Sequence, residues 1–243
     1  TGRCSTNGRT CGPIAPSTHA RTHARSRLRD DLAEVFERPA AERTRHARAV
    51  AAALHELRHL PAPQPLIGDA VFTGDALFID FSVADRYVRC VHNSFQDLVS
   101  KDSCVELFLQ PPGTSAYFNF ELNCCGTMLL YFIEDPTRHA TKVFRKATRI
   151  SSEAAAKIRV RSTLTGRIDP ERTGPTLWRV GLEIPIALVT EFVPKLRRFD
   201  GEWRGNFFKC GDDTSHPHWA AWNDIGQTLR FHQPRRFAPI RFE

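Results

Sequence analysis

From residue 66 to the end of the chain, apolar and polar residues alternate in short runs that are separated by Pro, Gly and Asn turns. Alternation over about four to eight residues is typical of a strand with one buried face. The runs that fit are 76–83, 104–110, 117–123, 127–133, 158–164, 178–184, 203–209 and 239–242. Because no helical pattern separates them, we expect antiparallel pairing. The chain is therefore predicted to be all-β, with an antiparallel two-sheet β-sandwich of the jelly-roll type over 66–243.

The segment before residue 66 has a different character. Residues 1–25 are rich in Thr, Arg, Ser, Gly and His and lack an apolar period, which predicts a disordered basic segment. In 26–65, apolar residues at helical spacings predict a short helical segment, broken near Pro39 and followed by a Pro-rich linker. The residues that set the spacing are Leu28, Leu32, Val35, Phe36, Val50, Leu54 and Leu57.

The positive charge of the chain is concentrated before the sandwich. Residues 1–60 contain 11 arginines and 6 acidic residues, so they carry five of the seven excess positive charges. A domain that binds nucleic acid gathers Lys and Arg on its own folded face, so we expect no nucleic-acid partner. No run of about 18 apolar residues is present, which predicts no membrane span. The chain begins with Thr and its one methionine is Met128, so we expect a fragment, a processed product or a truncated gene.

The seven cysteines contain no CxxC pair and no repeated spacing of a zinc ligand set. Buried free thiols are the first interpretation, because apolar residues surround them. A disulfide among Cys104, Cys124 and Cys210 is the alternative. His216-Pro217-His218, close to Cys210, lacks a regular ligand spacing, which argues against zinc there. The full set is Cys4, Cys11, Cys90, Cys104, Cys124, Cys125 and Cys210.

Four pieces of sequence carry a family resemblance by their order and spacing. They are 87–89 (Tyr-Val-Arg), 102–106 (Asp-Ser-Cys-Val-Glu), 117–123 followed by Gly126-Thr127, and a long C-terminal signature. That signature contains Trp178, Glu183-Ile184-Pro185, 203–212, Trp222-Asn223, 231–234 and Phe237. Together these pieces resemble the family 9 carbohydrate-binding modules, especially the stand-alone bacterial type. Residues 1–60 lie outside the resemblance.

The resemblance implies a two-sheet sandwich that binds a mono- or oligosaccharide without cleaving it, in polysaccharide degradation or carbohydrate catabolism. It requires no cofactor, although some members hold calcium. Asp102, Asp212 and Asp213 are the oxygen donors that would bind such an ion here. An extracellular or periplasmic location is implied as well, whereas the oligomeric state is not.

Sugar binding needs aromatic faces that cover the C–H side of a pyranose and planar polar groups that bind its hydroxyls. Glucan-binding members of the family hold the ring between two tryptophans, whose positions fall here on Val99 or Ser100 and near Phe231. Without both tryptophans we expect weak affinity, with Phe231 as one wall of the site. The candidate ligand-binding residues in the matched segments are Glu106, Asn119, Glu121, Asn206, Lys209, Trp222, Phe231 and His232.

Plainer interpretations compete at several of these positions. Glu106 and Glu121 could equally be exposed or ion-paired, with Arg204 and Lys209 as the partners to consider. Strand alternation places Asn206 and Lys209 on opposite faces, so the two cannot both contact one ligand. Most tryptophans in sandwiches belong to the core, and that alternative holds for all four here.

Two other classes of protein fit the same pattern. A glycoside hydrolase would use Glu106 and Glu121 as acid and base, because that chemistry requires paired carboxylates. An interaction sandwich that has lost sugar binding would explain the missing tryptophans. Motifs for nucleophilic, metalloprotease and nucleotide chemistry are not present in the sequence. The classes differ in their sites: an aromatic groove for a binder, a cleft with two facing carboxylates for an enzyme, and an exposed apolar patch for an interaction module.

Overall fold

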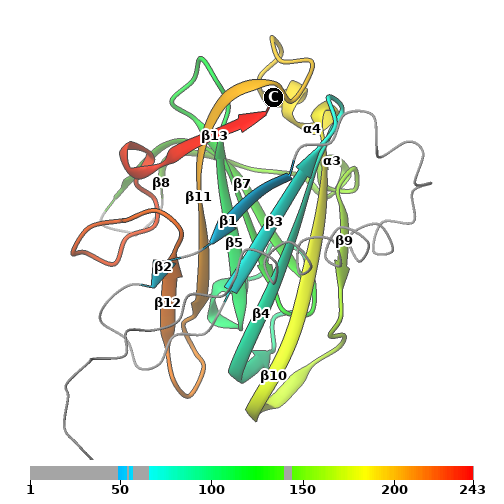
Figure 1. Cartoon of the computed structure of the whole chain (residues 1–243), viewed down its shortest axis with the longest axis vertical. Coiled ribbons are helices and arrows are strands. Elements are labelled where there is room, and N and C mark those ends of the chain that lie inside the picture. Colours follow the sequence, from blue (N-terminus) through cyan, green and yellow to red (C-terminus); the bar gives the residue numbers. More distant parts are fainter. Residues whose placement is uncertain (1–48, 54, 57–65, 140–143, 243) are drawn as a thin grey trace, which may run out of the picture. The chain divides into compact units, whose positions relative to one another are not determined.

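Two antiparallel sheets make up the fold, and the strands of the first sheet lie in front of those of the second in Figure 1. The first sheet has the order β1 (Ala49–Ala53), β3 (Leu66–Phe72), β4 (Ala76–Cys90), β10 (Ile168–Pro185) and β9 (Arg159–Ser162). The second has the order β2 (His55–Glu56), β12 (His218–Ala221), β11 (Gly201–Gly211), β5 (Cys104–Gln110), β6 (Tyr117–Asn123), β7 (Met128–Arg138) and β8 (Phe144–Arg149). β13 (Ala238–Phe242) pairs with β11. The predicted antiparallel sandwich is confirmed.

The computed structural model describes residues 49–53, 55–56, 66–139 and 144–242. The predictions for 1–25 and for most of 26–65 therefore lie outside the described residues. Short helical turns connect the strands: η1 (Val99–Lys101), α3 (Ser152–Ala155), α4 (Ile186–Phe192) and η2 (Pro234–Arg236). None of the described helices is long and apolar enough to cross a membrane.

Each of the eight predicted strands coincides with an observed one, and β5 and β6 have the predicted bounds. From residue 66 onward, the prediction missed β3, β8 and β12. Alternation does not mark β8, because most of its side chains are exposed, and β12 has only four residues. These strands form because neighbouring strands supply backbone partners rather than because of their own pattern.

The helix predicted to include Val50 is wrong for the residues described there. Ala49–Ala53 form strand β1, in which Val50 pairs with Ala70 of β3 in an antiparallel register. Alanine-rich segments favour helix only weakly in a folded protein, and tertiary pairing overrides the preference. β1 and β2 thus add to the sandwich from before residue 66.

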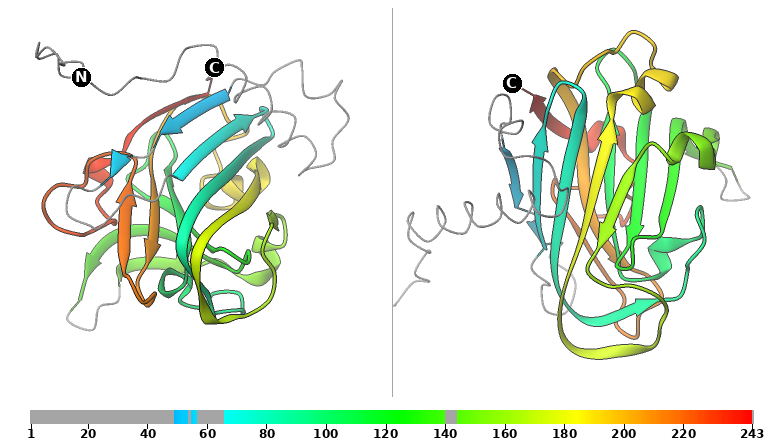
Figure 2. Two further views of the ribbon diagram at one scale, coloured as in Figure 1. Left: turned by 60° about the horizontal axis from the view of Figure 1, so that its bottom comes forward. Right: turned by 90° about the vertical axis from the view of Figure 1, so that its right-hand side faces the viewer.

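The space between the sheets is filled by one apolar core, which contains Phe81 of β4, Trp178 of β10 and Phe120 of β6, all fully buried. Figure 2 shows the two sheets from the side. The second sheet is also apolar on its outer face, where Phe108 and Phe208 belong to a separate cluster. Because both faces of this sheet are covered, its central strands β5, β6 and β11 are buried along most of their length.

Gly205 lets β11 run close to its neighbours. A Cβ at this position would lie 2.5 Å from the backbone oxygen of Phe108 and 2.7 Å from Cδ1 of Ile240. Gly205→Ala is therefore expected to destabilise the domain by about 1 to 3 kcal/mol, the usual range for overpacking, as measured by denaturant unfolding. Gly74→Ala is the control, because its added Cβ meets only the flexible side chain of Arg198. Equal losses in the two variants would contradict this explanation.

Candidate functional site

A cavity of about 460 Å³ lies on the outer face of the second sheet. Its floor comes from β5, β6 and β11, and its walls come from β12, the end of β7 and the segment 229–232. The lining residues are Ser100, Glu106, Glu121, Pro136, Arg138, Cys210, Asp212, Trp219, Leu229, Arg230, Phe231 and His232.

Strand register brings the two glutamates of the floor together. Glu106 of β5 is the direct antiparallel partner of Glu121 of β6, and directly paired residues point to the same face of a sheet. Their apolar neighbours in each strand point to the core between the sheets. The alternation that predicts the strands therefore also places both carboxyl groups in the cavity.

Burial controls the charge of these two carboxyl groups. Glu106 and Glu121 are 3% and 8% exposed. Burial raises the pKa of Glu121 from 4.5 to about 7, although a hydrogen bond from Asn119 opposes the rise. Burial raises the pKa of Glu106 well above its usual value, and the neighbouring Cys210 and Glu121 raise it further. Both groups therefore hold a proton at higher pH than ordinary glutamates do.

Polar neighbours hold the carboxyl groups in position. Asn119 Nδ2 donates to Glu121 Oε1 at 2.9 Å, and the Cys210 thiol donates to Glu106 Oε1 at 3.2 Å. Arg204 and Lys209, which the sequence suggested as ion-pair partners of the two glutamates, bind other groups instead. Arg204 donates to the carbonyl of Phe237, and Lys209 pairs with a carboxylate elsewhere. Asn119 thus supports the site from beside the cavity.

Phe231 and His232, two of the candidate ligand-binding residues, form an aromatic wall of the cavity. Phe231 stacks on Phe208 with ring centroids 4.1 Å apart, and the His232 ring stacks on Phe108 at 4.6 Å. His232 Nδ1 also lies 2.8 Å from the hydroxyl of Tyr117. Burial, with a smaller effect from Arg138, lowers the pKa of His232 to about 3. The imidazole is therefore neutral over the ordinary pH range.

Trp219, not Trp222, is the tryptophan of the cavity. Trp219 is the strand partner of Cys210, so it points to the outer face, and its Nε1 donates to Asp212 Oδ1 at 2.7 Å. Trp222 packs on the core between the sheets, edge-on to Phe207. Sequence reasoning favoured Trp222, because the register of the β11–β12 hairpin depends on a turn whose geometry the sequence does not reveal.

Two other predicted ligand-binding residues lie away from the cavity. Asn206 bonds to the backbone of Asn223, both as donor and as acceptor, and so fixes the chain after β12. Lys209, on the opposite face of β11, is 1% exposed and pairs with Asp85 of β4 at 3.2 Å. Asn206 pairs with Phe108 of the outer cluster and Lys209 with Val105 of the core, so the predicted opposite orientation of the two side chains is confirmed.

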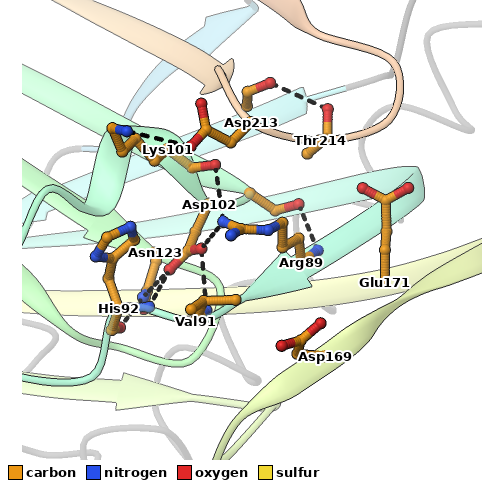
Figure 3. Close-up of polar contacts among 12 residues, drawn as sticks. Arg89, Val91, His92, Lys101, Asp102, Asn123, Asp169, Glu171, Asp213 and Thr214 are labelled. Carbon is orange, nitrogen blue, oxygen red and sulfur yellow. Dashed lines mark hydrogen bonds and ion pairs between the residues drawn. The ribbon is translucent and has the colours of Figure 1, made fainter.

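The three aspartates proposed for calcium bind donors of the protein. Asp102 accepts hydrogen bonds from Arg89, Asn123 and the backbone N–H groups that follow β4 (Figure 3). Asp213 pairs with Lys101, and Asp212 accepts from the indole of Trp219. A guanidinium, an ammonium and an indole N–H in these positions do not fit a shared calcium ion, which needs oxygen ligands around it.

The described cysteines are free thiols, in agreement with the first interpretation. Cys104 lies opposite Cys210 across β5 and β11, and both are buried. Cys90 and Cys124 are also buried, whereas Cys125 is partly exposed.

The sequence profile of carbohydrate-binding family 9 matches residues 64–242. A crystal structure of a Bacteroides uniformis protein that is assigned as carbohydrate-binding has 28% sequence identity and a TM-score of 0.70, covering 81% of this chain and 87% of that one. A family 9 module from Caldicellulosiruptor kristjanssonii, solved in complex with cellotriose, shares the fold at 12% identity and a TM-score of 0.50, covering 80% of this chain and 82% of that one. No curated protein sequence matches. With the profile covering the strands from β3 to β13, the chain belongs to carbohydrate-binding family 9.

Proposed function

We propose that the outer-face cavity binds a mono- or oligosaccharide without cleaving it, as part of polysaccharide degradation or carbohydrate catabolism. The observation that carries the proposal is the convergence of Glu106, Glu121 and Trp219 in one cavity. Carboxyl groups bind sugar hydroxyls, and an indole face covers the C–H side of a pyranose. Arg138 and Arg230 add donors at the rim.

Family membership supports the same function. The C. kristjanssonii module is a family member in complex with a glucose oligomer. The cavity of this chain has one tryptophan and one phenylalanine rather than two tryptophans. We therefore infer weak binding, with dissociation constants in the upper micromolar range or above, and a ligand different from a glucan chain end.

Trp219→Ala is expected to weaken saccharide binding by up to about tenfold, because loss of one stacking wall costs about 0.5 to 1.5 kcal/mol. Calorimetry on a panel of mono- and oligosaccharides measures the affinity. Trp222→Ala is the matched control, since this tryptophan packs on Phe207 between the sheets. It is expected to lower the melting temperature and leave the affinity unchanged. If Trp222→Ala weakens saccharide binding and Trp219→Ala leaves the affinity unchanged, the site lies on the other face of β11.

The hydrolase alternative retains one observation in its favour. Glu106 and Glu121 face each other across two strands, and burial raises the pKa of both, as a general acid requires. Incubation with the polysaccharide that the calorimetry selects tests this alternative. Release of reducing sugar by the parent protein, lost in Glu106→Gln, would replace the binding proposal by a catalytic one.

A further inference from the structure

Three cysteine sulfurs meet at the end of the sandwich where β4 ends. Cys90 is the last residue of β4, and Cys124 and Cys125 occupy the turn between β6 and β7. The three Sγ atoms all lie within 4.8 Å of one another, and those of Cys124 and Cys125 are 4.0 Å apart. Residues far apart in the sequence thus form one group of soft ligand atoms.

The turn that carries two of these sulfurs is held rigidly. Asn123 Oδ1 accepts from the backbone N–H groups of Cys125 and Thr127, and its Nδ2 donates to Asp102. The backbone N–H of Cys124 donates to the carbonyl of Ser103 at 2.8 Å. Gly126 closes the turn with a φ of +85°, a conformation that favours glycine. Such supporting contacts position ligands before a metal ion arrives.

The three thiols also differ in their access to solvent. Cys90 and Cys124 belong to the apolar core, whereas Cys125 is partly exposed and opens the group to solvent. A metal ion from solvent therefore reaches the group at the Cys125 sulfur.

We propose that Cys90, Cys124 and Cys125 bind one thiophilic d10 metal ion, Zn(II) or Cu(I). Soft thiolate ligands select these ions. With a metal–sulfur distance of about 2.3 Å, three sulfurs around one ion lie about 4 Å apart in a plane and slightly less in a tetrahedron. The 4.0 Å separation of Cys124 and Cys125 fits either arrangement. In Zn(II) a water molecule or other exogenous ligand completes the tetrahedron from the side of Cys125.

This site is separate from the proposed saccharide cavity. A second group of possible metal ligands, Cys104, Glu106 and Cys210, is fully buried and supplies two residues to the cavity lining. The three-cysteine group contributes no residue to that lining. A metal ion bound to Cys90, Cys124 and Cys125 would therefore hold the β6–β7 turn against the end of β4 and would not contact the sugar.

Titration of the reduced, chelator-treated full chain with Zn(II), and in parallel with Cu(I), tests the proposal. Cys4 and Cys11 are replaced by serine in every protein compared, so that only thiols of the sandwich respond. We expect one ion per chain, a thiolate-to-metal absorption band, and X-ray absorption with three sulfurs at about 2.3 Å. The ion with the higher affinity in the two titrations identifies the preferred metal.

Loss of a contact that only supports a metal ligand weakens metal binding by about 10- to 100-fold. Cys125→Ala removes a ligand itself, so it is expected to weaken metal binding by more than this. Cys90→Ala serves as a second variant, and thermal unfolding shows that each variant is folded. Cys104→Ala is the matched control, because it removes a buried thiol of the other group, and it is expected to bind metal like the parent. Unchanged binding in folded Cys125→Ala and Cys90→Ala, or loss of binding in Cys104→Ala, would overturn the proposal.

Discussion

Replacement of Lys209 by methionine is expected to lower the free energy of unfolding by about 3 to 5 kcal/mol, because it leaves the charge of Asp85 buried without its partner. For a domain of this size that loss corresponds to a fall in melting temperature of roughly 6 to 20 °C. The measurement is denaturant unfolding at neutral pH, with the melting temperature as a second readout.

The expected loss of stability follows from the surroundings of the Lys209–Asp85 ion pair. The side chains of Lys209 and Asp85 are 1% and 0% exposed, with Nζ and Oδ2 3.2 Å apart. Burial raises the pKa of Asp85, but the charges of Lys209 and then His218 outweigh this and lower it, so the carboxylate stays ionised. Trp178 Nε1 lies 3.5 Å from the same oxygen. Because Asp85 is on β4 and Lys209 on β11, the pair joins the two sheets.

Two comparisons isolate this effect. Lys101→Met removes the lysine of an exposed ion pair with Asp213, whose side chains are 41% and 44% exposed, and is expected to cost less than about 1 kcal/mol. The double variant Lys209→Met/Asp85→Asn removes both buried charges and is expected to recover most of the loss. A double variant that is no more stable than Lys209→Met would show that packing, not the unpaired charge, causes the loss.

Lys209 also illustrates which parts of the site could be predicted from the sequence. Period-2 alternation depends only on neighbouring residues, so it located β5 and β6 and placed Glu106 and Glu121 on strands. The same alternation predicted that Asn206 and Lys209 point to opposite faces. It could not tell which face is the inner one, because both faces of the second sheet are apolar.

The features that sequence reasoning missed depend on contacts between distant segments. Trp219 enters the cavity because the β11–β12 hairpin pairs it with Cys210. Asp102 resembles a metal ligand in the sequence, but folding surrounds it with donors such as Arg89. Cys90 and Cys125 are separated in the sequence by β5 and β6, and their sulfurs come together only because the turn after β6 lies beside the end of β4. Turn geometry and strand order, which single-sequence patterns do not encode, decide all three.

Glu121→Gln is expected to stabilise the domain at pH 8 and to leave its stability at pH 4 nearly unchanged. The pKa of Glu121 is raised from 4.5 to about 7 in the folded chain. Because of this raised pKa, Glu121 keeps its proton to a higher pH in the folded state than in the unfolded chain. The free energy of unfolding therefore falls as the pH rises from about 4.5 through 7. The loss is on the order of 3 kcal/mol, and a neutral glutamine avoids it.

Denaturant unfolding of the parent and the variant across this pH range measures the difference. Glu202→Gln is the control, because this carboxylate is exposed and pairs with Arg241 at the surface, and its effect is expected to stay below about 1 kcal/mol at each pH. A Glu121→Gln variant that is less stable than the parent at pH 8 would mean that the folded chain favours the carboxylate.

The same titration should control saccharide affinity. Sugar hydroxyls donate to a carboxylate more strongly than to a neutral acid, so a bound sugar should lower the pKa of Glu121 and bind the ionised form better. The affinity of the parent is then expected to fall by up to about tenfold for each pH unit below 7. Glu121→Gln is expected to bind weakly at every pH and to lose this dependence, whereas Glu202→Gln keeps it. Calorimetry at pH 5.5 and 8 separates these outcomes, because a pH-independent affinity in the parent would mean that Glu121 does not accept from the sugar.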